Sequence, residues 1–260
     1  MFQTISISTD ARGVALLTLE RAEKHNALDA AMIAELTQAA DILAQDTDVR
    51  VVVLCARGKS FCAGGDLGWM QDQMRADNGT RAREAGKLAA MLSALNRLPK
   101  PLIGRVHGQA FGGGVGMMAV CDVAIGAQGA KFGLTETRLG LIPATIGPYV
   151  LARMGEAMAR RVFMSARIFD APEAVELGLL ARVVPLDELD AAVEAEIAPY
   201  LDCAPGAVAR AKRLAQDLGA GIGADAVEHS IKELVACWEG PEAREGVAAF
   251  FERRKPDWAK

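Results

Sequence analysis

The sequence predicts an α/β fold followed by a helical C-terminal region, and three observations support this prediction. Residues 51–54, VVVL, are a continuous apolar run, as in a strand that is covered on both faces. A second apolar run, residues 102–106, leads into a glycine cluster and then into a helix-like segment. Beyond Pro185 only helix-like patterns occur, and this change predicts a boundary near residues 195–205 between the α/β core and a helical C-terminal segment.

The chain begins with a predicted hairpin, because two apolar runs at residues 5–7 and 14–19 are separated by a turn-like segment. Asp29 is a residue type that caps helices, and apolar side chains recur after it at helical spacing. Residues 71–81, QDQMRADNGTR, are polar and predict a mobile loop over a site. The apolar positions within residues 88–98 then predict an amphipathic helix that ends before a proline.

The remaining segments complete the α/β region and then change in character. Strands are expected at residues 123–127, 131–134 and 181–184, with a capped helix at residues 170–178 between the last two. Four helix-like segments follow, at residues 186–201, 207–218, 224–238 and 243–254. We therefore expect an α/β core over residues 1–197 and a helical region over residues 198–260.

Composition and charge restrict the classes of function. Of the 260 residues 51% are apolar and 24% charged, as in an ordinary globular protein. The net charge of −4 argues against nucleic acid as a partner. No apolar stretch approaches the roughly 18 residues of a membrane span, and no signal peptide is recognisable, so a cytoplasmic protein without a membrane partner is expected. The five cysteines and three histidines are scattered, so neither disulfides nor a metal site are predicted.

The glycine cluster at residues 112–114 predicts an anion or oxyanion site. Glycine allows close approach to the backbone, and the first N–H groups of a helix have no partner within the helix. A dinucleotide site is disfavoured, although residues 114–119 fit the G-x-G-x-x-A pattern, because the next strand does not end in an acid. A tight turn that needs small residues for packing is the alternative for this cluster taken alone.

Five sequence blocks together resemble the crotonase, or enoyl-CoA hydratase and isomerase, superfamily. In chain order they are RAEKHNAL at residues 21–28, SFCAGGDL at 60–67, PKPLIGRVHGQAFGGGVGMMAVCD at 99–122, FGLTETRLGLIP at 132–143 and AAFFERRKP at 248–256. The resemblance implies a spiral of ββα units that assembles into homotrimers or into hexamers made of two trimers. It also implies an acyl-CoA thioester substrate and no cofactor, because coenzyme A is part of the substrate. In such a protein the CoA and acyl site would belong to the core at residues 1–197, and residues 198–260 would form the oligomerisation region.

The resemblance also assigns site residues by position. The backbone N–H groups of Gly65 and Gly113 correspond to the family's oxyanion-hole donors, and Glu136 corresponds to a catalytic glutamate. The expected substrate contacts are Lys24, Ala63, Asp66, Leu67 and Gly116. Lys24 matches a position near the CoA phosphates and Ala63 lies on the expected CoA path, whereas Asp66 also has the position of a helix cap.

Gly116 departs from the family's pattern, because typical hydratases carry a second glutamate there. One interpretation is a hydratase that resembles bacterial methylglutaconyl-CoA hydratases of leucine or isoprenoid breakdown, with Gly116 leaving room for a branched or carboxylated acyl chain. The alternative is a Δ3-Δ2-enoyl-CoA isomerase that uses Glu136 alone to move a proton between two carbons. Dehalogenation, decarboxylation, thioester hydrolysis and non-catalytic acyl-CoA binding also remain open.

Overall fold

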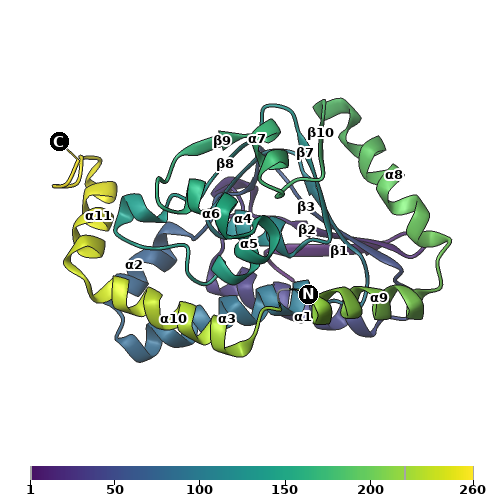
Figure 1. Ribbon diagram of the computed structural model, residues 1–260, viewed down its shortest axis with the longest axis horizontal. Coiled ribbons are helices and arrows are strands. Elements are labelled where there is room, and N and C mark those ends of the chain that lie inside the picture. Colours follow the sequence, from purple (N-terminus) through teal and green to yellow (C-terminus); the bar gives the residue numbers. More distant parts are fainter. Residues whose placement is uncertain (1, 220, 260) are drawn as a thin grey trace.

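The computed structural model describes residues 2–219 and 221–259, and its elements follow a strand–strand–helix order (Figure 1). The strands are β1 (Ile5–Thr9), β2 (Val14–Leu19), β3 (Val51–Ala56), β4 (Ser60–Cys62), β5 (Leu102–Val106), β6 (Gln109–Phe111), β7 (Val123–Ala127), β8 (Lys131–Gly133), β9 (Ile168–Asp170) and β10 (Arg182–Val184). The helices of the core are α1 (Ala30–Gln45), α2 (Leu67–Arg75), α3 (Asn78–Asn96), α4 (Gly113–Val120), α5 (Gly147–Met154), α6 (Glu156–Phe163) and α7 (Ala171–Glu176). They are followed by α8 (Leu189–Leu201), α9 (Pro205–Leu218), α10 (Ala224–Glu239) and α11 (Pro241–Glu252), and short 3-10 helices are η1 (Ala22–Lys24), η2 (Glu136–Leu139) and η3 (Leu186–Glu188).

Two sheets organise the core, and the chain visits them in turn. The larger sheet has the order β1-β2-β3-β5-β7-β10, parallel except for the β1–β2 hairpin, and the smaller has the order β4-β6-β8-β9. Each of β3, β5 and β7 is followed by a short strand of the smaller sheet and then by helices. This repetition is the predicted spiral of ββα units.

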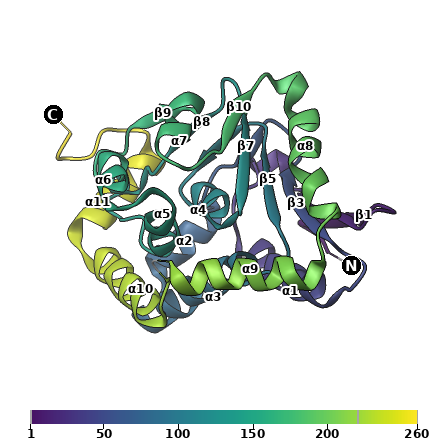
Figure 2. The ribbon, with the colours of Figure 1, turned by 45° about the vertical axis from the view of Figure 1, so that its right-hand side comes forward.

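Both faces of the larger sheet are buried, as the continuous apolar run in β3 predicts. Val51 and Val53 pack in one apolar cluster with the inner face of α8, whereas Val52 and Leu54 belong to the main core with α1, α3 and α4. Figure 2 shows α8 along one side of the sheet strands and α9 beside α1 and α3. The carboxyl ends of β3, β5 and β7 therefore lead to one region, from which the β4, β6 and β8 segments begin.

The helix cap predicted at Asp29 is present, but the loop predicted at residues 71–81 is not. Asp29 caps α1 by accepting a hydrogen bond from the Met32 N–H at 2.8 Å. Residues 71–81 were expected to be a loop, but they form the end of α2 and the start of α3, with a break of two residues at Ala76 and Asp77. Most of the polar side chains there lie on exposed or half-buried faces of the two helices, whereas Gln73 is buried, and the Asp77 side chain caps the second helix.

The C-terminal helices fold back onto the α/β core. α10 and α11 bury Trp238, Ala243 and Val247 in a small apolar cluster with Leu141, which follows η2. Among the described residues, no helix is both long enough and apolar enough to span a membrane.

Two glycines allow the backbones of α11 and η2 to touch. A Cβ on Gly246 in α11 would lie 2.5 Å from the carbonyl carbon of Leu139. Gly140, which has a φ of +69°, closes η2, and a Cβ there would lie 2.6 Å from the Ala243 nitrogen. The atoms that such a Cβ would meet belong to the backbone, so they cannot move aside by a change of rotamer. Any larger residue must therefore displace α11 from η2.

We predict that Gly246→Ala lowers the free energy of unfolding by about 1–3 kcal/mol, because the added methyl group overlaps the Leu139 backbone. The matched control is Gly86→Ala in α3, where a Cβ meets nothing within 4 Å. Alanine there should stabilise the protein by about 0.5–1 kcal/mol through its higher helix propensity. Urea unfolding of both variants measures the difference, and equal effects would contradict the close contact.

Candidate active site

One cavity, of about 340 Å³, gathers the sequence blocks that are far apart in the chain. Its wall includes Leu28, both glycine turns, η2, the segment 141–146, and side chains from α10 and α11. A second hollow, of about 360 Å³, lies between α3 and α10, where Asn78 and Glu239 are hydrogen bonded. Only the first hollow contains a buried acid, so it is the candidate active site.

The first glycine turn follows β4 and is held by residues 21–28. The Leu28 N–H donates to the Gly64 carbonyl at 2.7 Å, and the Asp66 N–H donates to the Leu28 carbonyl at 2.9 Å. Asn26 is fully buried, and its Nδ2 donates to the Ser60 carbonyl at 2.9 Å and to another carbonyl in the β3–β4 turn. These contacts explain why the block at residues 21–28 occurs together with the block at residues 60–67.

The second glycine turn joins β6 to α4 and lies against the first. Gly112 has a φ of +47°, and a Cβ on Gly113 would be 3.9 Å from the Cα of Gly64. Within residues 2–219 and 221–259, neither the Gly65 N–H nor the Gly113 N–H donates to a protein acceptor. The structure thus brings together two glycine turns, each lining the cavity and each with an unpaired N–H at the predicted position.

Glu136 is the first residue of η2 and lines the same cavity. A Cβ on Gly112 would be 2.9 Å from Glu136 Oε1, so the carboxyl group lies directly against the second glycine turn. The residue as a whole is partly exposed, but its Oε2 atom is buried and has no hydrogen-bond partner among the described residues. Burial raises the pKa of Glu136 to about 7, against an ordinary value of 4.5. This carboxyl group can therefore both accept and donate a proton near neutral pH.

Gly116 lies beside this site but does not line the cavity. A Cβ on Gly116 would overlap the Cγ2 atom of Ile146 and would be 2.9 Å from the Ile146 Cβ. Ile146 therefore occupies the space into which a side chain at position 116 would project. The expectation that Gly116 leaves room for the acyl chain is not met, because a residue that follows η2 in the chain fills that room.

The other predicted contacts fall into two groups. Ala63 and Leu67 line the cavity, whereas Lys24 is exposed on η1 and Asp66 is not part of the wall. Asp66 caps α2 by accepting from the Gly68 N–H at 2.8 Å, and it pairs with Arg21 at 3.0 Å. Burial alone would raise the pKa of Asp66, but the hydrogen bonds from Arg21 and from the α2 backbone hold it below its ordinary value. The structure thus supports a capping role for Asp66.

Several wall residues were not predicted from the sequence. They come from the segment after η2 and from the C-terminal helices, namely Ile142, Thr145, Ile146, Leu234, Trp238 and Phe250. The sequence predicts these two C-terminal helices, but it predicts them as part of an oligomerisation region and not as part of the site. The sequence contains no signal for which of these apolar side chains turn towards the cavity of their own chain.

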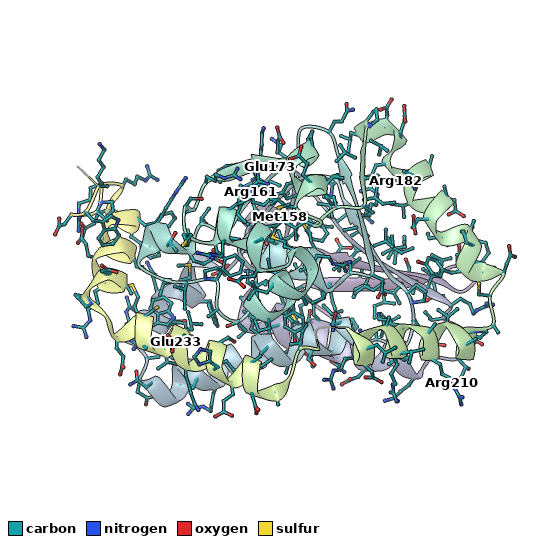
Figure 3. The ribbon with its side chains drawn as sticks, in the orientation of Figure 1. Met158, Arg161, Glu173, Arg182, Arg210 and Glu233 are labelled. Atoms are coloured by element: carbon teal, nitrogen blue, oxygen red, sulfur yellow. The ribbon has the colours of Figure 1, made fainter. Side chains whose placement is uncertain are left out.

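Strand β9 brings Ile168 to the cavity, and an ion-pair cluster holds the segment beside it. Glu173 on α7 accepts from Arg161 on α6 at 3.2 Å and from Arg167 at 2.7 Å. Figure 3 shows Arg161 and Glu173 near each other, beside Met158. The hydrogen bonds from Arg167 are the main reason that the pKa of Glu173 is below its ordinary value. The Arg161 pair connects α6 to α7, and the Arg167 pair connects α7 to the residue that precedes β9.

These features define a class of protein: an α/β protein built as a spiral of ββα units, with one buried acid beside two glycine turns. The family model described as enoyl-CoA hydratase/isomerase matches residues 9–260. The chain therefore belongs to the enoyl-CoA hydratase/isomerase family, and it is an enzyme of the hydro-lyase type.

Similar proteins cover almost the whole chain. A probable enoyl-CoA hydratase of Mycobacterium bovis is 33% identical over 260 residues, which is 99% of this chain and 98% of that protein. The 2,3-dehydroadipyl-CoA hydratase of Escherichia coli is 34% identical over 94% of both chains, and the mitochondrial methylglutaconyl-CoA hydratase of Rattus norvegicus is 32% identical over 96% and 80%. The crystal structure of a putative enoyl-CoA hydratase from Mycobacterium avium paratuberculosis superimposes with a TM-score of 0.89 at 31% identity, covering 99% of this chain and 100% of that one. The predicted crotonase-like fold is confirmed.

We predict that Gly116→Glu alone destabilises the protein by about 1–3 kcal/mol, because the new side chain collides with Ile146. Ile146→Gly removes the obstructing atoms, so Gly116→Glu should cost less in that background than in the wild-type chain. A double-mutant cycle on the free energy of unfolding measures this coupling, with Ile146→Gly as the matched single variant. Additive effects would show that Ile146 does not occupy the space at position 116.

We also predict that Glu136→Gln stabilises the protein at pH 8 and much less at pH 4. Because the folded pKa is about 7 and the ordinary value is 4.5, the folded chain binds the proton more tightly, and its stability falls as the pH rises between these values. The shift corresponds to on the order of 3 kcal/mol above pH 7. Urea unfolding of both proteins at pH 4, 6 and 8, at one protein concentration, measures the difference. A stability difference that is independent of pH would contradict the burial of an ionisable carboxyl group.

Proposed function

We propose that the protein adds water across the 2,3 double bond of an enoyl-CoA thioester, with Glu136 as its acid–base residue. The observation that carries this proposal is the Glu136 carboxyl group, which is buried against the second glycine turn and has a pKa of about 7. A group with this pKa is present in both protonation states at neutral pH, so one residue can perform two proton transfers. The names of the relatives support hydration.

The reaction then requires two proton transfers through the same carboxyl group. The Glu136 carboxylate takes a proton from water while the water oxygen bonds to C3, and the electron pair of the double bond moves into the thioester to give an enolate. The protonated Glu136 returns the proton to C2, the enolate collapses, and the product is the 3-hydroxyacyl thioester. One water is consumed and Glu136 ends as a carboxylate. No cofactor is required beyond the coenzyme A that the substrate carries.

The Gly65 and Gly113 N–H groups are the proposed donors to the enolate oxygen. Both line the cavity, both lack protein acceptors, and the second stands at the N-terminus of α4, whose dipole favours negative charge. Backbone donors are fixed in place and do not titrate, so they stabilise charge that develops during the reaction at no cost in reorganisation. Removal of one such donor typically raises the barrier by roughly 2.7–4 kcal/mol.

The contacts with the CoA part and the acyl part are also proposals. Ala63 and Leu67 line the cavity beside the first glycine turn, which supports Ala63 on the CoA path and Leu67 as a substrate contact, and the exposed Lys24 is accessible to a CoA phosphate. For the acyl part, 3-methylglutaconyl-CoA is the candidate that the name of the rat relative suggests, but its terminal carboxylate would meet no cation among the described residues that line the cavity.

A Δ3-Δ2-enoyl-CoA isomerase is the second candidate. One observation favours it: among the described residues that line the cavity, Glu136 is the only carboxylate. An isomerase needs a single group that removes a proton from C2 of the 3-enoyl thioester and returns it to C4, through a dienolate whose negative charge develops on the same thioester oxygen. The two reactions share every proposed site residue, so only the products distinguish them.

Homotrimers or hexamers remain the proposed assembly, and the cytoplasm remains the proposed location. Exposed apolar side chains on α9, such as Leu214 and Leu218, support contacts between subunits. Cavity side chains from α10 and α11 show that the helical region also serves the site of its own chain.

We expect the protein to hydrate crotonyl-CoA, and Glu136→Gln to lower kcat by about 10²–10⁴-fold with little change in affinity for a saturated acyl-CoA. Loss of absorbance by the conjugated thioester measures hydration, and a gain of absorbance from a 3-enoyl-CoA measures isomerisation. Because the carboxylate form of Glu136 acts first in hydration, kcat/KM should rise with pH and level off above about pH 7.

The site is tested against two other outcomes. Conversion of the 3-enoyl thioester without hydration of any conjugated thioester would establish the isomerase. Binding of acyl-CoA thioesters without turnover of either kind would indicate a non-catalytic binder. Near-normal rates in Glu136→Gln would remove Glu136 from its proposed role, and Glu136→Asp serves as a control that keeps the carboxylate.

A further inference from the structure

The wall of the cavity has no positive charge. Among the described residues that line it, none is Arg, Lys or His, and Glu136 is the only ionisable carboxyl group. Beyond Glu136, the wall is formed by apolar side chains of three segments, including Leu139, Leu141, Ile142, Leu234, Trp238 and Phe250. An acyl chain that extends from the glycine turns past Glu136 therefore meets aliphatic and aromatic groups.

Two cations lie near wall residues without lining the cavity. The Arg81 guanidinium carbon is 5.9 Å from the centroid of the Trp238 ring, but its nitrogens donate to the carbonyls of Gln73 and Met74 at the end of α2. Arg138 is on η2, two residues after Glu136, yet it is exposed and does not line the cavity. Neither residue is therefore placed to pair directly with a group inside the cavity.

The polar groups that remain are neutral. Trp69 Nε1 and Thr145 Oγ1 belong to wall residues, are buried, and have no hydrogen-bond partner among the described residues. Two such groups can hydrogen bond a water or a neutral oxygen, but they do not offset a full negative charge. A substrate carboxylate would be a second anion in a cavity that already contains Glu136, and a like charge disfavours the carboxylate form that begins the reaction.

We propose that the acyl chain of the substrate is neutral and apolar, and that the cavity discriminates against acyl chains that end in a carboxylate. This inference rests on the proposed function, because it assigns the cavity to the acyl part of a CoA thioester. It separates this chain from the relatives that are named for dehydroadipyl-CoA and methylglutaconyl-CoA, whose acyl groups carry a second carboxylate. The substrates for which those relatives are named are therefore not assigned to this chain on the basis of overall sequence similarity.

The first experiment measures binding without turnover. Hexanoyl-CoA and adipyl-CoA have acyl chains with the same number of carbons and differ in the terminal carboxylate. Calorimetric titration of the wild-type protein should show that hexanoyl-CoA binds at least about 100-fold more tightly. Equal affinities, or tighter binding of adipyl-CoA, would overturn the proposal.

The second experiment places a cation in the wall. Leu234→Arg on α10 should improve the affinity for adipyl-CoA relative to hexanoyl-CoA by at least about tenfold, because the new guanidinium pairs with the terminal carboxylate. Leu234→Gln is the matched control, which is polar but uncharged and should leave the ratio close to that of the wild type. Equal changes in the two variants would show that charge in this cavity does not set the preference.

Turnover separates this inference from the proposed function. The ratio of kcat/KM for trans-2-hexenoyl-CoA to that for 2,3-dehydroadipyl-CoA should also be at least about 100. If neither thioester is hydrated but the binding preference is present, the proposed function fails and the neutral acyl site stands. If both are hydrated at equal kcat/KM with equal binding, the hydratase stands and the neutral acyl site is refuted.

Discussion

The Glu136 carboxyl group can lie against the second glycine turn only because Gly112 has no side chain, since a Cβ there would be 2.9 Å from Oε1. This close approach accompanies the burial that raises the pKa of the carboxyl group to about 7, and it places Glu136 in the wall of the cavity that Gly65 and Gly113 also line. Burial of the ionised acid lowers the free energy of unfolding, and the apolar packing on both faces of the main sheet offsets this loss. Position, pKa and proximity to the proposed oxyanion donors therefore have one physical origin.

Much of the core could be predicted from the sequence because its signals are local. The apolar run in β3 and the cap at Asp29 reflect preferences of neighbouring residues, and both appear in the structure. Residues 71–81 were misjudged because polarity was taken as a sign of a loop, whereas exposed helix faces are equally polar. The three-residue strands β4, β6 and β9 were not predicted, whereas β8 and β10, which are equally short, lie within predicted strands. Three residues have no periodic pattern of their own, so strands of this length are recognised only where a neighbour such as Leu134 continues the apolar run.

The site was only partly predictable, and the reason is distance along the chain. The glycine turns and Glu136 stand in recognisable blocks, and the structure brings them into one cavity. What fills the space at Gly116 could not be read from the block that contains it, because Ile146 comes from a segment that follows η2. The uncharged character of the cavity wall depends in part on side chains of α10 and α11. The sequence of those helices does not specify which of their faces meets the cavity.

The contact between Gly246 and the Leu139 backbone means that α11 directly supports η2, the segment that carries Glu136. Movement at the C-terminus is transmitted to η2 through main-chain atoms, which yield far less than side chains do. A fusion joined at the C-terminus, or a truncation within α11, would therefore act on the chemistry some 110 residues earlier in the chain, between Glu136 and Gly246. A tag joined at the N-terminus would leave this contact unchanged.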